Sequence, residues 1–182
     1  MSVQAKTLEG GCTCGHVRYK LNSKPLIVHC CHCRWCQRQS GTAFAINALF
    51  DAVDVELLQG DVLEITMPSP SGNGQKITRC PKCQVAVWSS YYMGGIKDGI
   101  RFIRAGTLDD PDQLPPDVHI FTSTKQPWVV LPPDDLAVDI FYDYETTWTP
   151  ENLARREALL AKSTDDVFEQ QLQRTAGPEE GS

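Results

Sequence analysis

The sequence has no long hydrophobic segment. No stretch approaches the roughly 20 consecutive apolar residues that a membrane-spanning helix needs, and residues 1–6 lack the apolar run of a secretory signal. We therefore expect a cytoplasmic protein that makes no membrane contact. Its 182 residues suffice for one domain with a sizeable core.

Dense clusters of basic residues are also missing. Residues 1–106 contain 12 Lys and Arg against 7 Asp and Glu, whereas residues 107–182 contain 5 against 16. The acidic second part would repel nucleic-acid phosphates, so we expect no nucleic acid among the partners. The mildly basic first part can attract a small anion.

Cysteine is the residue that the sequence has in unusual number. The chain contains 8 cysteines, and four of them lie with two histidines in residues 29–36. In a reducing compartment, clustered cysteines indicate metal binding rather than disulfide bonds. The CxCxxC spacing of Cys31, Cys33 and Cys36 lets one backbone turn direct three sulfurs at one zinc ion. Three ligands leave one tetrahedral position open, which is the arrangement of a catalytic zinc.

A second set of four cysteines forms two pairs that are far apart in the sequence. Cys12 and Cys14 form a CxC pair, and Cys80 and Cys83 form a CPxC turn. Such a turn needs two more ligands, which the first pair can supply. This set predicts a closed structural zinc that joins remote parts of a sheet.

Cys30 is left over by these two sets. On spacing alone it competes with Cys31 as the third ligand of the open site, because Cys30 and Cys33 also form a CxxC pair.

Histidines and arginines beside the cysteines are further candidates. His29, His32 and His119 are possible general bases, since imidazole titrates near neutral pH. His29 or His32 can instead close the open zinc as a fourth ligand, and His119 can be a packing residue. Arg34 and Arg38 can hold substrate carboxylates through paired hydrogen bonds.

Most of the chain up to residue 105 has the pattern of short elements. Val17, Tyr19 and Leu21 alternate with polar residues, which is the period of a half-buried strand. Residues 35–40 predict a short helix that ends at Gly41. Further strands are expected at 43–50, 86–88 and 100–103, and a hairpin is expected between 55–58 and 62–65.

The last third of the sequence has a different character. Residues 107–135 are rich in Pro and Asp, and we expect an irregular segment across the sheet, in which Phe121 and Trp128 either cover the metal site or complete the core. Helices are expected after Thr149-Pro150 and again from Ser163. The expected division is a zinc-binding β domain at 1–145, a helical extension at 146–176 and a disordered tail at 177–182.

Four motifs occur in order along the chain. They are GGCTCGHVRY at 10–19, CHCRWC at 31–36, CPKC at 80–83 and GTLDDP at 106–111, and they are followed by LPPDVHIF at 114–121. Together they resemble the glutathione-dependent formaldehyde-activating enzyme family, which includes centromere protein V. The resemblance implies a mainly β, β-tent zinc-binding fold, here with short C-terminal helices.

The resemblance also implies how the cysteines are used. Two zinc ions per chain are expected, with Cys31 rather than Cys30 in the open site. If the strand geometry persists, Cys30 then faces away from that metal. The closed ion is assigned to Cys12, Cys14, Cys80 and Cys83, and the open, catalytic ion to Cys31, Cys33 and Cys36.

The family's reference reaction joins glutathione and formaldehyde to S-hydroxymethylglutathione. By resemblance, this chain is expected to be a carbon–sulfur lyase or synthase whose partners are a small thiol and a small aldehyde, with a homo-oligomer possible. Gln37, Arg34 and Gln84 depart from the residues common in the family, which leaves substrate identity open. The alternative is a non-catalytic, zinc-stabilised module that binds another protein.

Overall fold

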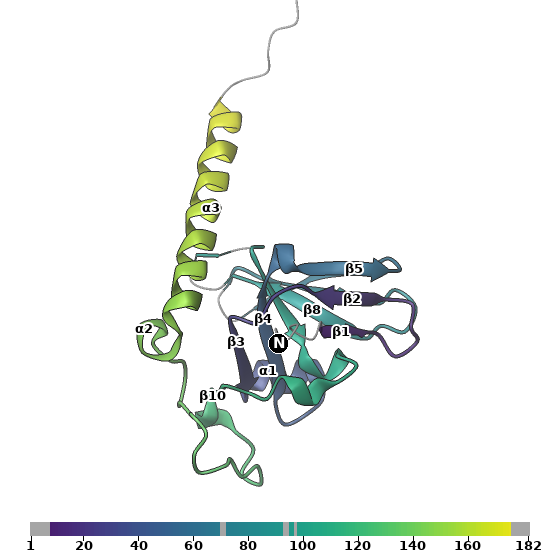
Figure 1. Cartoon of the computed structure of the whole chain (residues 1–182), viewed down its shortest axis with the longest axis vertical. Helices are drawn as coiled ribbons and strands as arrows, with labels where there is room; N and C mark the ends of the chain where they lie inside the picture. Colours follow the sequence, from purple (N-terminus) through teal and green to yellow (C-terminus); the bar gives the residue numbers. More distant parts are fainter. Residues whose placement is uncertain (1–7, 70–71, 93–94, 97, 176–182) are drawn as a thin grey trace, which may run out of the picture.

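Two β-sheets form the framework of the computed structural model, which describes residues 8–69, 72–92, 95–96 and 98–175. The smaller sheet has the strand order β1-β2-β5, and the larger one has the order β10-β3-β4-β9-β8-β7-β6. This arrangement confirms the expected mainly β fold (Figure 1). The strands are β1 (Leu8–Gly11), β2 (Arg18–Leu21), β3 (Ile27–Cys31), β4 (Ala45–Asp51), β5 (Val55–Gln59), β6 (Leu63–Met67), β7 (Gln75–Arg79), β8 (Ala86–Tyr91), β9 (Ile100–Arg104) and β10 (Val118–Ile120).

A core between the sheets is built from the alternating residues of β2 and its neighbours. Val17, Tyr19 and Leu21 are buried as their period predicts. The Tyr19 ring meets Trp88 edge to face at a centroid distance of 5.6 Å, and its hydroxyl lies 2.7 Å from Thr107 Oγ1. The aromatic packing holds the smaller sheet against the larger one, and the hydroxyl contact joins it to the turn that follows β9.

The predicted hairpin between residues 55 and 65 is wrong. β5 pairs with β2 in the smaller sheet, whereas β6 pairs with β7 in the larger sheet. The chain crosses between the sheets at Gly60, where a side chain would meet the His16 carbonyl oxygen at 2.1 Å. Both segments have strand periodicity, but β5 pairs with the remote strand β2, and β6 pairs with β7, the next strand along the chain.

The short helix α1 (Arg34–Ser40) confirms the prediction for this segment. Gly41 ends it in the left-handed conformation with φ of 70°, which glycine adopts without strain. At the other end, Cys33 caps the helix, because its sulfur accepts a hydrogen bond from the Cys36 amide at 3.3 Å. The local sequence therefore places two of the three open-site cysteines within one turn.

A single C-terminal helix replaces the two that were expected. After the short α2 (Tyr144–Thr147), α3 runs without a break from Pro150 to Thr175. Thr149 Oγ1 accepts the Asn152 amide hydrogen bond at 3.2 Å, as an N-cap does. The first half of α3 lies beside β3 and the second half extends past the sheet (Figure 1). The tail at 177–182 is outside the described residues, and no described helix has the length and apolar character needed to cross a membrane.

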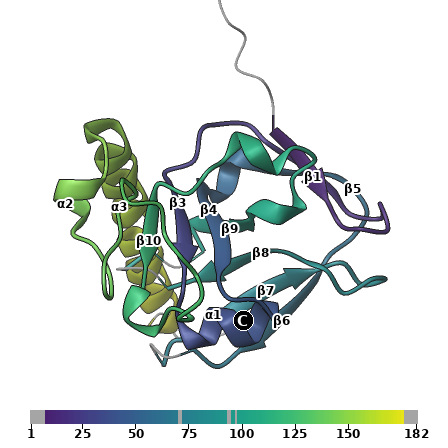
Figure 2. The same cartoon turned by 90° about the horizontal axis from the view of Figure 1, so that it is seen from below.

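The irregular segment after β9 returns to the larger sheet as its edge strand. It contains short 3-10 turns at Ala105–Thr107, Pro111–Gln113 and Thr122–Thr124, while a further one, Ala52–Asp54, follows β4. β10 pairs with β3 in parallel, with His119 opposite Cys30 and Ile120 opposite Cys31. Figure 2 shows β10 next to β3 at the edge of the larger sheet. Trp128 is 72% exposed, so of the two alternatives for this residue, the one in which it completes the core is wrong.

Candidate metal centres and the cavity beside them

The two remote cysteine pairs come together in space. The sulfurs of Cys12, Cys14, Cys80 and Cys83 all lie within 4.8 Å of one another, with 3.7 Å between those of Cys14 and Cys80. Amide hydrogen bonds from Val17 to Cys12 and from Cys83 to Cys80 fix two of the sulfurs. All eight cysteines are free thiols. Four converging sulfurs are the donor set of a closed zinc site, so these residues fit the ion that was expected here.

Gln84, next to this group, is one of the residues that depart from the family pattern, and the structure shows how the backbone accommodates it. Its φ is 62°, in the left-handed region where glycine is favoured. The side-chain Nε2 of Gln84 donates to the Pro81 carbonyl oxygen at 2.9 Å and so supports the turn. The backbone accepts a side chain here, at a cost of roughly 1 kcal/mol.

The second group consists of the thiols of Cys31, Cys33 and Cys36. Cys31 ends β3, while the other two belong to the cap and first turn of α1, and the three sulfurs lie within 4.8 Å of one another. Hydrogen bonds from the Cys31 and Cys36 thiols lower the pKa of Cys33. No further cysteine, histidine or carboxylate in the described part of the chain joins this group. Three converging sulfurs with an open side fit a zinc that keeps one position for a ligand.

A cavity of about 560 Å³ lies over the three thiols of this second group. This volume is within the range of small-molecule sites. Apolar rings and a few polar groups form its walls, including Phe121, for which covering the metal site was one of the two alternatives. The other lining residues besides the thiols are His29, Arg34, Trp35, Arg38, Asn47, Gln75, Ser89, Tyr91, Phe102, Arg104, Ile120, Thr124 and Phe141.

Arg104 is a cavity residue that sequence reasoning missed. Asn47 of β4 lies opposite both His29 and Arg104, which puts the three side chains on one face of the sheet. Arg104 donates to Asn47 Oδ1 and, at 2.6 Å, to Gln39 Oε1. Burial lowers the pKa of its guanidinium, while the nearby Cys36 sulfur acts in the opposite direction. The signal available in the sequence was an arginine at the end of the apolar strand sequence IRFIR. Which side chains Arg104 would meet depended on the register of β9 in the sheet.

His29 faces the cavity with one ring nitrogen already in use. Its Nε2 lies 2.6 Å from Tyr142 Oη, which also accepts a hydrogen bond from Trp148 Nε1 at 2.9 Å. Burial lowers the pKa of His29 to about 3, so the ring is neutral near pH 7. No ring nitrogen of His29 belongs to the group of ligand atoms formed by Cys31, Cys33 and Cys36, so His29 does not join the three thiols as a ligand.

The other two histidine candidates lie together, apart from the three thiols. His32 Nε2 is 2.9 Å from His119 Nδ1 and 3.5 Å from Cys30 Sγ. Burial, together with the charges of His119 and Lys125, lowers the pKa of His32 to about 4. From the sequence, His32 and His119 were separate candidates for a general base. The pairing of β3 with β10 brings them into one cluster with Cys30.

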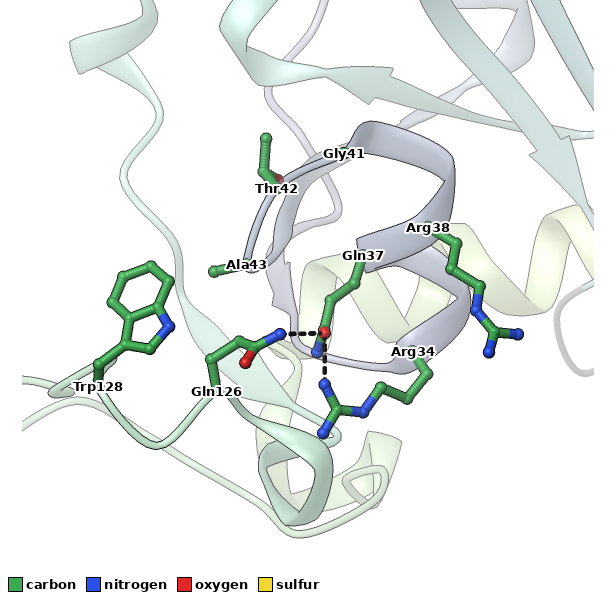
Figure 3. A pocket seen from close by; sticks show the side chains of 8 residues that line it. All are labelled: Arg34, Gln37, Arg38, Gly41, Thr42, Ala43, Gln126 and Trp128. Atoms are coloured by element: carbon green, nitrogen blue, oxygen red, sulfur yellow. Dashed lines mark hydrogen bonds between the residues drawn. The ribbon is translucent and has the colours of Figure 1, made fainter.

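A second, shallower hollow of about 920 Å³ lies on the outer side of α1, and its residues are shown in Figure 3. At its centre, Gln37 Oε1 accepts from Arg34 at 2.8 Å and from Gln126 at 2.9 Å. Gln37 Nε2 donates to the His32 and Thr124 carbonyl oxygens. Only an amide can accept and donate in this way, which explains why no basic residue stands at position 37.

A mainly β framework with two converging cysteine groups, one beside a cavity, places the chain among cysteine-rich proteins that can bind metal. The family model described as glutathione-dependent formaldehyde-activating enzyme matches residues 7–124, more than half of the sequence, and the chain belongs to this family. A crystal structure of a Rhodobacter sphaeroides protein is similar at 18% identity and a TM-score of 0.43, over 56% of this chain and 87% of that one. No curated protein matches the chain.

Proposed function

We propose that this protein accelerates the reversible addition of a thiol, such as glutathione, to a small aldehyde, such as formaldehyde. In this reaction the sulfur forms a bond to the carbonyl carbon, the carbonyl oxygen takes up a proton, and the thiol proton is released. The observation that carries the proposal is the group of Cys31, Cys33 and Cys36, which faces a cavity of about 560 Å³ and has no fourth ligand among the described residues. Membership of the family supports the same reaction.

The cysteines would hold the metal that this chemistry uses. We infer that Cys12, Cys14, Cys80 and Cys83 hold a structural zinc. A second zinc on Cys31, Cys33 and Cys36 would supply an electrophile that lowers the pKa of a thiol or polarises a carbonyl oxygen.

Around the three thiols, the chain itself supplies positive charge. Arg104 holds a buried guanidinium beside the sulfurs, and its bonds to Asn47 and Gln39 fix the orientation of that group. A fixed positive charge stabilises negative charge on a thiolate or on the developing alkoxide oxygen. The aromatic side chains of Phe102, Phe121 and Phe141 line the same space and would keep water away from the reacting atoms.

Replacing Arg104 with lysine should lower the rate of adduct formation about tenfold, because lysine keeps a charge but cannot make both fixed hydrogen bonds. The rate is measured by NMR exchange spectroscopy on a mixture of glutathione, formaldehyde and protein. The matched control is Arg101→Lys in the same strand, since Arg101 bonds Ser90 and the Asp98 carbonyl oxygen instead. Equal rates for both variants would remove Arg104 from the mechanism.

Replacing both Arg34 and Arg38 with alanine should raise the KM for glutathione about tenfold, because paired hydrogen bonds to the substrate carboxylates are lost. Both side chains line the cavity as well as the outer hollow (Figure 3). The two arginines therefore lie where the carboxylates of glutathione would be when its thiol group is at the three cysteines. A Lys24→Ala, Lys162→Ala double variant removes two exposed positive charges elsewhere and serves as control. An unchanged KM in the arginine variant would dismiss this role.

A further inference from the structure

Strand pairing creates a third cluster of metal-ligating side chains beside the two cysteine groups. Successive side chains of a strand point to opposite faces, so Cys30 points away from the cavity that Cys31 lines. In the parallel pair of β3 and β10, His119 stands opposite Cys30 and Ile120 opposite Cys31. Cys30 and His119 therefore share the face that is turned away from the proposed reaction site.

His32, which follows β3, completes this cluster. Its Nε2 lies 3.5 Å from Cys30 Sγ and 2.9 Å from His119 Nδ1, and the three ligand atoms all lie within 4.8 Å of one another. All three residues are buried. The Phe44 ring packs against His32 at a centroid distance of 5.4 Å. The cluster is thus a small set of one thiol and two imidazoles with an apolar wall.

Asp135 fixes the orientation of one of these imidazoles. Its Oδ2 lies 3.1 Å from His119 Nε2, so the Nε2 proton is directed to the carboxylate and Nδ1 faces His32 with its lone pair. A carboxylate behind a ligating histidine is the common second-shell arrangement of zinc sites. The carboxylate is partly exposed, which leaves a route from solvent to the cluster.

We propose that Cys30, His32 and His119 form a third metal site, which takes a zinc-type divalent cation. Tetrahedral zinc with ordinary bond lengths places sulfur and nitrogen ligands roughly 3.6 Å apart and two nitrogens roughly 3.3 Å apart. The sulfur–nitrogen distance of 3.5 Å already fits, and the 2.9 Å between the imidazoles must open slightly. Binding releases the Cys30 thiol proton to solvent.

Such an ion would fasten β10 to β3. His119 is the middle residue of the three-residue strand β10, which is the edge of the larger sheet and leads directly to Phe121 in the cavity wall. The proposed ion would therefore support the cavity from behind without contacting a substrate. It is independent of the proposed reaction, because none of its three ligands lines the cavity.

The test is the zinc content of the full-length protein, purified with zinc present, and of its Cys30→Ser variant. We expect one zinc fewer per chain in the variant, and an anomalous zinc signal between residues 30, 32 and 119 in crystals of the wild-type protein. Because the result is a difference between two proteins, it holds whether or not the other sites are catalytic. Equal zinc content in both proteins overturns the proposal and leaves a hydrogen-bonded Cys-His-His cluster.

A second variant protects the test against misfolding at the buried thiol. Asp135→Asn should weaken zinc binding at this site by about 10- to 100-fold in competition with a chromophoric chelator, because the carboxylate no longer supports His119. Asp134→Asn makes the same charge change at the neighbouring exposed residue and should bind as the wild-type protein does. Equal affinities for the two variants would also overturn the proposal.

Discussion

A Cys33→Ser variant is expected to lose about 100-fold of the rate of adduct formation, which would bring it close to the rate in buffer. Cys33 is the middle thiol of the open group, and its sulfur is fixed by the Cys36 amide at the start of α1. Serine keeps that cap but is a poor zinc ligand, so the electrophile at the open position is lost. An electrophile of this kind contributes several kcal/mol, and each 1.4 kcal/mol corresponds to about a factor of ten in rate.

The same NMR exchange experiment used for Arg104 measures this loss. Far-UV circular dichroism of the variant serves as the control, and it should match that of the wild-type protein, because the four-cysteine group is untouched. If the wild-type protein itself gives no acceleration over buffer, the enzyme proposal fails. The alternative of a non-catalytic, zinc-stabilised interaction module is then favoured.

A Cys80→Ser variant is expected to lose more than about 4 kcal/mol of unfolding free energy, since loss of a structural metal is among the largest effects of single substitutions. Cys80 is fully buried and follows β7, while Cys12 and Cys14 follow β1 in the other sheet. A closed ion there would fasten the two sheets to each other. Binding energy at a site that the unfolded chain lacks becomes folding energy.

Urea unfolding at a fixed zinc concentration measures this difference. The control is Lys82→Ala, an exposed residue between the two cysteines of the same turn, which should change stability by less than about 0.5 kcal/mol. A chelator should destabilise the wild-type protein at least as strongly as the Cys80 substitution does. Equal stability of the two variants would show that the four thiols do not hold a structural ion.

Sequence patterns with a short range were reliable guides to this fold. Burial of Val17, Tyr19 and Leu21 followed from period-two alternation, and α1 ended at Gly41 because glycine alone adopts the left-handed cap without strain. The hairpin at residues 55–65 failed for a reason of longer range. Strand periodicity shows that a segment can pair but carries no information about which partner it takes.

The candidate site shows the same division. The spacing of Cys31, Cys33 and Cys36 was enough to expect their convergence, because the end of one strand and the cap and first turn of the helix that follows it hold all three. Arg104 was missed, since its position beside these thiols requires the register between β4 and β9. His32 and His119 were considered singly, although the register between β10 and β3 makes them neighbours.

The sequence by itself therefore determined the cysteine groups, the mainly β character and the family, all of which depend on residue type and local spacing. Tertiary structure alone decided which strands pair, which face each side chain takes and which histidine meets which cysteine. The physical reason is that a one-residue change in register moves every side chain of a strand to the other face of the sheet. That choice is made by the packing of the whole core, and no short segment contains it.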